Sequence, residues 1–416
     1  MKKIIYVFLA GCLFAACNQD DCNLGIETTS EVSQTVNHRV SIEQAKANAV
    51  EFVSKLQSKT RSYNPQSLEV ENVQAISFRD VVTRSDGDSI NLDSLLYIVN
   101  FADSCGFVIA GTDDREKAIY AYVENGNYSW EDTESMNDGF KAFIYSLLEI
   151  KSKVYACEIP KPDDGTIGGG PGAGGGYEPD KFEVMYPLLK TKWSQREPYN
   201  EYVPDYHYTG CVVTAISQIC SYLELPYSVD WTYNNTHGSA TFNWASINSD
   251  CEIHNGLMLS NENNDQIAQL MRYWGLAFQA DYSADGTGVD PDNAISLMKN
   301  DGFSISGLHD YNSGDVIDDL KAGNRIIFMC GYSRYYHVGF VFRHYVDGHA
   351  WVVDGYIDEV KNNVHSYYLH CNWGWGGTSN GYYLSDTFNT GDGPVYNDNA
   401  TRSNYQYNLE FATFFK

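Results

Sequence analysis

Residues 209–219 read T-G-C-V-V-T-A-I-S-Q-I and predict one strong helix. Val212, Ile216 and Ile219 recur at intervals of four and three, which is typical of a helix that buries one face. The helix is expected to run from Cys211 to Leu225, because the proline that follows cannot continue it.

Cys211 stands in the first turn of this helix, directly after Gly210, which allows a sharp turn of the backbone. Unpaired amide N–H groups and the positive end of the helix dipole would stabilise a thiolate at this position. Cys211 is therefore a candidate nucleophile. The alternative is a small buried residue that helps the helix to start.

A histidine that could act as a base follows far downstream, in the segment D-G-H-A-W-V-V-D-G-Y at residues 347–356. The apolar run after His349 predicts a buried strand, and a residue at the start of a strand can face a cleft. His349 lies roughly 140 residues after Cys211, a separation at which a base follows the nucleophile in some cysteine hydrolases. A hydrogen-bonded core histidine is the alternative.

Two further segments carry polar groups suited to the same chemistry. In H-C-N-W-G-W-G-G at 370–377, Asn372 could accept the second ring N–H of His349, and Trp373 could shield that bond from water. In K-W-S-Q at 192–195, Gln195 could form an oxyanion hole with the Cys211 backbone N–H. Taken singly, the first segment reads as a glycine-rich turn and the second as a polar surface.

A glycine-rich stretch divides the chain. Residues 168–176 read G-G-G-P-G-A-G-G-G, which cannot offset its ordering entropy by burial, so 163–180 is expected to be a linker. It separates a region at 40–162 from one at 181–416, and each is of domain size.

Both regions have α+β patterns. Helices are predicted at Ala45–Leu56, Met136–Val154, Cys211–Leu225, Asp265–Tyr273, Pro291–Lys299 and Val316–Leu320. Strands are predicted at Leu96–Phe101, Gly106–Ala110, Ala118–Val123, Ile326–Cys330, Val338–Arg343, His349–Tyr356, Ser366–Trp373 and Gly381–Leu384. In the second region helices precede a twisted sheet, as in an α+β domain of two halves.

The N-terminus reads as an export signal. Two lysines precede an apolar run from Ile4 to Ala16, which is long enough for a signal peptide and too short to span a bilayer. The run ends in L-F-A-A-C, which resembles a bacterial lipoprotein cleavage site and implies lipidation of Cys17. We therefore expect a signal peptide at 1–16, a tether at 17–39 and a lipid-anchored, exported protein; the alternative is ordinary cleavage and release.

The net charge and the cysteine spacing argue against two classes of function, nucleic-acid binding and zinc binding. The net charge of −26 disfavours nucleic-acid binding. The ten cysteines include no C-x-x-C pair, so no zinc site is expected and most cysteines should be free and buried.

Together the four segments resemble the streptopain family of papain-like bacterial cysteine peptidases. The resemblance implies a two-lobed papain-like domain at 181–416 with Cys211 as nucleophile, His349 as base and Gln195 as oxyanion donor. It implies Asn372 first, and Trp373 with it, beside the histidine.

The N-terminal region resembles the propeptide of the same family, through S-I-E-Q-A-K-A-N-A, L-Y-I-V-N-F and G-F-V-I-A-G-T-D-D-R. The resemblance implies that 40–162 occupies the active-site cleft of the precursor and is removed by proteolysis, with 163–180 as the activation region. A glycine-rich loop at Asn389–Pro394 would then border the substrate site; a plain turn is the alternative.

The implied function is that of a secreted cysteine endopeptidase made as a zymogen. It would need no metal or organic cofactor and would hydrolyse proteins through an acyl-enzyme. The alternatives are a papain-like cell-wall amidase or transferase, and a surface binding protein without turnover.

Overall fold

The computed structural model describes residues 38–59, 68–77, 94–155, 179–331, 334–338, 342–388 and 409–416. The expected signal peptide, Cys17, almost all of the tether and linker, and the loop Asn389–Pro394 lie outside these residues. Within the described segments, none of the helices combines the length and apolarity that crossing a bilayer requires.

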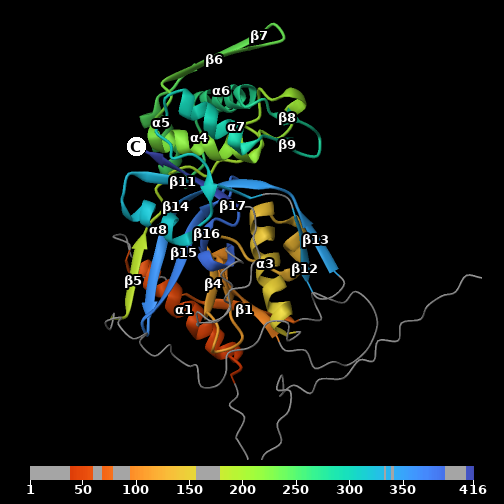
Figure 1. Cartoon of the computed structure of the whole chain (residues 1–416), viewed down its shortest axis with the longest axis vertical. Helices are drawn as coiled ribbons and strands as arrows, with labels where there is room; N and C mark the ends of the chain where they lie inside the picture. The colour runs from red at the N-terminus through yellow and green to blue at the C-terminus, as the bar shows by residue number, and fades with distance from the viewer. Residues whose placement is uncertain are drawn as a thin grey trace, which may run out of the picture.

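One antiparallel sheet forms the centre of the described structure (Figure 1). Its strands follow the order β1-β2-β3-β4-β16-β15-β14-β11-β17-β10, and β5 pairs with β14 beside this path. The strands of the N-terminal region are β1 (Val70–Ser77), β2 (Ser94–Phe101), β3 (Phe107–Ala110) and β4 (Ile119–Val123). Those of the C-terminal region are β5 (Lys181–Met185), β10 (His309–Asp310), β11 (Arg325–Gly331), β14 (His349–Lys361), β15 (Val364–Asn372), β16 (Gly381–Leu384) and β17 (Leu409–Phe415).

Two helices pack on the N-terminal part of the sheet. In α1 (Ile42–Ser58) the hydroxyl of Ser41 accepts a hydrogen bond from the Gln44 N–H and so caps the helix. The face that α1 buries carries apolar residues at helical spacing, which confirms the predicted helix. The other helix, α3 (Asp138–Tyr155), lies between the sheet and the strand pair β12 (Arg334–Val338) and β13 (Phe342–Val346) (Figure 1).

A helical lobe covers the opposite end of the sheet (Figure 1). It contains α4 (Cys211–Leu223), α5 (Trp244–Ile253), α6 (Asn261–Ala277) and α7 (Pro291–Asn300), with hairpins β6 (Ser228–Tyr233)–β7 (Thr236–Thr241) and β8 (Asp281–Tyr282)–β9 (Thr287–Gly288). These helices share one apolar core with the inner faces of β11, β14 and β17. The α+β class and the two-part arrangement of 181–416 are as predicted.

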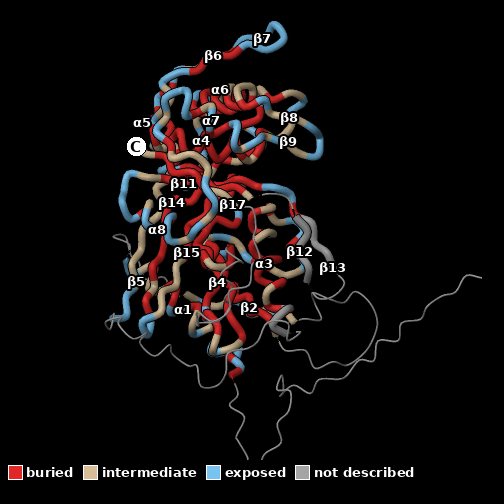
Figure 2. The backbone as a smooth tube through the Cα atoms, viewed as in Figure 1, coloured by how far each residue is buried: buried red, intermediate tan, exposed pale blue. Residues whose placement is uncertain are grey.

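The N-terminal and C-terminal regions share a sheet and a core. Strand β4 pairs with β16, with Tyr122 opposite Tyr382. The rings of Phe143, in α3, and Tyr383, in β16, lie 4.8 Å apart in an apolar cluster that draws on both regions. Figure 2 shows the buried backbone continuing across this junction.

The structure corrects one predicted strand. The segment Val338–Arg343 is not a single strand, because β12 (Arg334–Val338) ends where it begins and β13 (Phe342–Val346) pairs back antiparallel. Two short helices complete the described elements of this region: α8 (Ser313–Lys321) and α9 (Ser385–Phe388).

Candidate active site

Helix α4 presents Cys211 at its N-terminus. Gly210 has a φ of 96°, a left-handed conformation that favours glycine, and it occupies the N-cap position. The Thr214 N–H donates to the Gly210 carbonyl at 3.0 Å, which closes the first turn. The helix ends at Leu223, two residues before the predicted end, because Glu224 adopts the left-handed conformation.

The sulfur of Cys211 lies against the beginning of β14. Burial raises the pKa of this half-buried thiol, and the nearby backbone N–H groups of Ala350 and Val212 oppose that rise. The carboxylate of Asp138, in the first turn of α3, raises the thiol pKa further. Since Ala350 directly follows His349, the structure brings the two predicted residues to the same place.

His349 is buried, and its ring is held in one tautomer. Its Nε2–H donates to the carbonyl oxygen of Trp373 at 3.0 Å, which leaves Nδ1 as the acceptor nitrogen. Burial lowers the pKa of His349, while Asp138 and the Trp373 carbonyl oppose the fall. Among the described residues no hydrogen bond joins His349 to Cys211, and the directions of the two pKa shifts both favour the uncharged thiol and imidazole.

The backbone of the oxyanion candidate is tied to the chain just before the nucleophile. Gln195 is buried, and its backbone carbonyl accepts a 3.0 Å hydrogen bond from the Thr209 N–H, two residues before Cys211. This bond ties the W-S-Q segment to the chain that enters α4.

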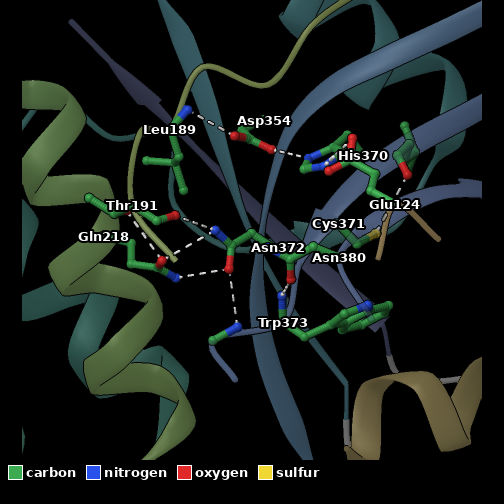
Figure 3. A network of polar contacts seen from close by, with 12 residues as sticks. Glu124, Leu189, Thr191, Gln218, Asp354, His370, Cys371, Asn372, Trp373 and Asn380 are labelled. Carbon is green, nitrogen blue, oxygen red and sulfur yellow. Dashed lines mark hydrogen bonds and ion pairs between the residues drawn. The ribbon is translucent and has the colours of Figure 1, made fainter. Parts of the chain in front are cut away.

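Among the described residues no hydrogen bond joins Asn372 to His349, in contrast to the predicted arrangement. Its Nδ2 donates to the Thr191 carbonyl at 2.9 Å and to Oε1 of Gln218 at 3.2 Å (Figure 3). The acceptor for the His349 ring is instead the backbone carbonyl of Trp373. Sequence reasoning missed this acceptor because it compared side chains, and a backbone carbonyl leaves no signature in residue type.

Trp373 lies beside the histidine as predicted. Its ring is fully buried, with its centroid 6.2 Å from that of His349. The indole N–H donates to the Ser379 carbonyl at 2.9 Å, and the Trp373 backbone N–H donates to Oδ1 of Asn380 at 3.1 Å. These bonds fix both the ring and the carbonyl that holds His349.

The N-terminus of α3 covers this site. A methyl group added at Gly139 would lie 2.0 Å from Cε3 of Trp373, so the backbone of α3 packs directly on that indole. Beside it, Nδ2 of Asn137 donates to the Thr378 carbonyl at 3.4 Å. Asp138 forms a 2.6 Å ion pair with Lys141, and both charges influence the pKa of His349.

A second buried histidine joins the two regions and was not singled out from the sequence. Nδ1 of His370 lies 2.6 Å from Oδ1 of the buried Asp354, and its Nε2 lies 3.7 Å from Oε1 of Glu124 in the N-terminal region (Figure 3). Burial alone would lower the pKa of His370, but the two carboxylates raise it to about 10. His370 is therefore a cation at neutral pH.

The remaining cysteines and carboxylates offer little further chemistry. The six cysteines that the structure describes are free, and four of them are buried, as expected. The His/Asp group in the described ranges with metal-like spacing is His38, Asp113 and Asp114, where Asp113 also binds the Arg115 guanidinium. It lies in the N-terminal region, away from Cys211.

This arrangement is that of a cysteine peptidase covered by its own inhibitor domain. Residues 193–383 match the Peptidase C10 family, and residues 37–149 match the Spi protease inhibitor. Residues 193–383 are therefore a peptidase C10 domain and residues 37–149 an inhibitor domain, so the chain is a cysteine peptidase made as a zymogen.

Two sequence relatives support this assignment, and one solved structure is similar to the chain. Streptopain from Streptococcus pyogenes serotype M1 is 26% identical over 350 residues, which cover 73% of this chain and 78% of the relative. The thiol protease/hemagglutinin PrtT from Porphyromonas gingivalis is 24% identical over 343 residues, which cover 72% of this chain and 35% of the relative. A solved fragment of Prevotella intermedia prointerpain A is 21% identical with a TM-score of 0.49, covering 82% of this chain and 98% of the fragment.

Proposed function

We propose that Cys211 is the nucleophile and His349 the general base of an endopeptidase that hydrolyses protein substrates. The observation that carries the proposal is the proximity of the two elements: the backbone N–H of Ala350, next to His349, is near enough to the sulfur at the head of α4 to lower the pKa of the thiol. The Nε2–H bond to Trp373 supports the role of His349, because it leaves Nδ1 to take the thiol proton.

The reaction proceeds in two halves. Nδ1 of His349 takes the proton of Cys211, and the sulfur attacks the peptide carbonyl carbon. The oxyanion is stabilised by the Cys211 N–H and the Gln195 amide, the C–N bond breaks, and His349 protonates the leaving amine. Water then attacks the thioester with His349 as base, which releases the acid and restores the thiol.

The precursor is held inactive by α3. Its first turn lies on Trp373 and places the carboxylate of Asp138 where it disfavours a thiolate at Cys211. We assign the inhibitory domain to 40–162, the cleaved linker to 163–180 and the peptidase to 181–416. Once α3 leaves, His349 and Cys211 form the proton-sharing pair.

The residues beside His349 have separate roles in this proposal. Trp373 shields the imidazole and orients it through its carbonyl. Direct orientation by Asn372 would require Asn372 to exchange one of its present partners in the mature enzyme, so we assign it a supporting position.

We further propose that the protein is exported and anchored through a lipid on Cys17. The support is the sequence alone: two lysines, the apolar run Ile4–Ala16, and L-F-A-A-C before the cysteine. Metabolic labelling with a fatty acid should mark the wild type and not Cys17→Ala. Equal labelling of both would exclude this anchor.

The activity is tested with the processed protein. A thiol alkylator should abolish casein hydrolysis, and Cys211→Ala should be inert, because the other thiols described in 181–416 are buried. Cys220→Ala, on the same helix, is the matched control and should remain active. Undiminished hydrolysis by Cys211→Ala would refute the proposal, and activity on peptidoglycan but not on casein would favour an amidase.

A further inference from the structure

A pair of side-chain amides links the helix of the nucleophile to the strand beside the histidine. Nε2 of Gln218 donates to Oδ1 of Asn372 at 3.2 Å, and Nδ2 of Asn372 donates back to Oε1 of Gln218 at 3.2 Å (Figure 3). Both residues are buried, with exposed fractions of 0% and 2%. A reciprocal amide pair fixes both groups in orientation as well as distance.

Gln218 lies on the same side of α4 as the nucleophile. It follows Cys211 by seven residues, which is about two helical turns and returns to nearly the same face. Most of its neighbours on the helix are apolar or small, and a buried amide there is unfavourable unless its hydrogen bonds are made. Gln218 is therefore placed to fix the position of α4 through hydrogen bonds made two helical turns after Cys211.

The same amide also holds the segment that leads to the oxyanion candidate. Oε1 of Gln218 accepts hydrogen bonds from the Trp193 N–H at 3.0 Å and from the Thr191 hydroxyl at 3.2 Å. Trp193 is two residues before Gln195. The distance between Cys211 and Gln195 thus depends on Gln218 from one side and on the Thr209 bond from the other.

Asn372 carries the connection to the histidine. Its Oδ1 accepts a hydrogen bond from the Gly374 N–H at 3.2 Å. That N–H belongs to the same peptide unit as the carbonyl of Trp373. The carbonyl of Trp373 is the group that holds Nε2 of His349. Displacement of the amide pair would therefore move the Trp373 carbonyl, which fixes the orientation of the His349 imidazole.

We propose that Gln218 is a positioning residue for peptide hydrolysis, because one amide sets the relative placement of α4, the 191–195 segment and the carbonyl of Trp373. It touches no reacting atom and acts through Asn372 and the backbone. The inference rests on the proposed roles of Cys211, His349 and Gln195. Misplacement of a catalytic group by about 1 Å can lower a rate about 100-fold.

The first test compares Gln218→Met with Gln269→Met in the processed enzyme. Gln269 is also a buried helical glutamine, and it accepts a 2.9 Å bond from the Trp231 indole, away from the site. Active sites are counted with an irreversible thiol reagent, and kcat and KM are measured per titrated site. We expect kcat to fall about 10- to 100-fold in Gln218→Met with KM changed less than about threefold, and Gln269→Met to lose stability in urea with kcat unchanged.

The second test uses Gln218→Glu, which keeps the shape and serves even if Gln218→Met does not fold. The protonated carboxyl can still donate to Asn372, whereas the ionised form faces its Oδ1 with no donor. We expect kcat near the wild-type value at acidic pH and a new descending limb as the carboxyl ionises, with the folded fraction unchanged across that range.

The third test exchanges the pair, as Gln218→Asn with Asn372→Gln. The exchange keeps the total length of the two side chains, so the double variant should be more active than either single variant. Wild-type kcat and pH profile per titrated site in both Gln218→Met and Gln218→Glu would overturn the proposal. Hydrolysis that persists in Cys211→Ala would instead overturn the proposed function, so the two failures are distinguishable.

Discussion

Substitution of Gly139 by alanine should open the precursor without touching the peptidase region. The added methyl carbon would lie 2.0, 2.3 and 2.9 Å from three carbons of the Trp373 ring. That ring is fully buried and anchored by its N–H bond to the Ser379 carbonyl, so it cannot move aside. Apolar contacts are optimal near 3.5 Å, so α3 must retreat by roughly 1.5 Å.

Gly139→Ala has two opposing effects on the free energy of the precursor. Overpacking of this kind costs about 1–3 kcal/mol, whereas replacing a helical glycine by alanine favours the helix itself by about 1 kcal/mol. The helix term acts whether or not α3 is docked, but the overpacking term acts only in the docked state. The undocked population should therefore rise roughly 5- to 150-fold.

The assay uses the inert Cys211→Ala precursor and a trace of processed wild-type enzyme. Cleavage between the inhibitory and peptidase regions should be faster when Gly139→Ala is added. Gly286→Ala is the matched control, because a methyl group there meets nothing within 4 Å. Equal cleavage rates for Gly139→Ala and the control would show that α3 is not held by contact with Trp373.

Two further predictions concern pH. In the precursor, burial raises the pKa of Cys211 and lowers that of His349, so alkylation of Cys211 should be slow at neutral pH and become fast only in alkali. In the processed enzyme the alkylation rate should rise at lower pH. Identical pH profiles for the two forms would contradict the uncharged pair. The pKa of His370 is raised from 6.5 to about 10, so its stabilising contribution is complete below pH about 6.5 and is lost as the pH rises towards 10. Glu124→Gln should lower the unfolding free energy of the Cys211→Ala precursor by about 1 kcal/mol at pH 7. The loss of stability in alkali should also begin at a lower pH. Urea titrations indistinguishable from those of the parent would exclude the ion pair.

Local patterns predicted the elements that carry the site. The spacing of Val212, Ile216 and Ile219 located α4, and the apolar run after His349 located β14, because both patterns reflect burial of one continuous face or strand. The same patterns placed α1 and α3. In each case the sequence signal and the packing concern the same few residues.

Features that depend on distant partners could not be predicted in this way. The pairing of β4 with β16 joins segments far apart in the sequence, and neither strand records its neighbour. The apolar character of Val338–Arg343 concealed a change of direction between two strands. The hairpin β6–β7 was also missed, although Asn234 and Asn235, both with positive φ, are a turn signal that could have revealed it.

Gln218 illustrates a different limit. A glutamine within V-V-T-A-I-S-Q-I-C is visible as a polar interruption of a buried face, but its meaning depends on Asn372 and Trp193, which reach it only in the folded chain. Sequence reasoning assigned Asn372 to the histidine because that pairing is chemically reasonable. The fold gives the amide another partner and leaves the histidine to a backbone oxygen.

The shared sheet has a consequence for the lifetime of the enzyme. When the inhibitory region departs, β16 loses the neighbour that pairs with residues 381–383, and apolar side chains around Tyr383 lose Phe143. Water would then reach a strand edge and part of a former interior, so we expect the processed form to unfold more readily than the precursor. On this expectation, the cleavage that activates the enzyme also shortens its lifetime, because the contacts that inhibit the precursor also stabilise it.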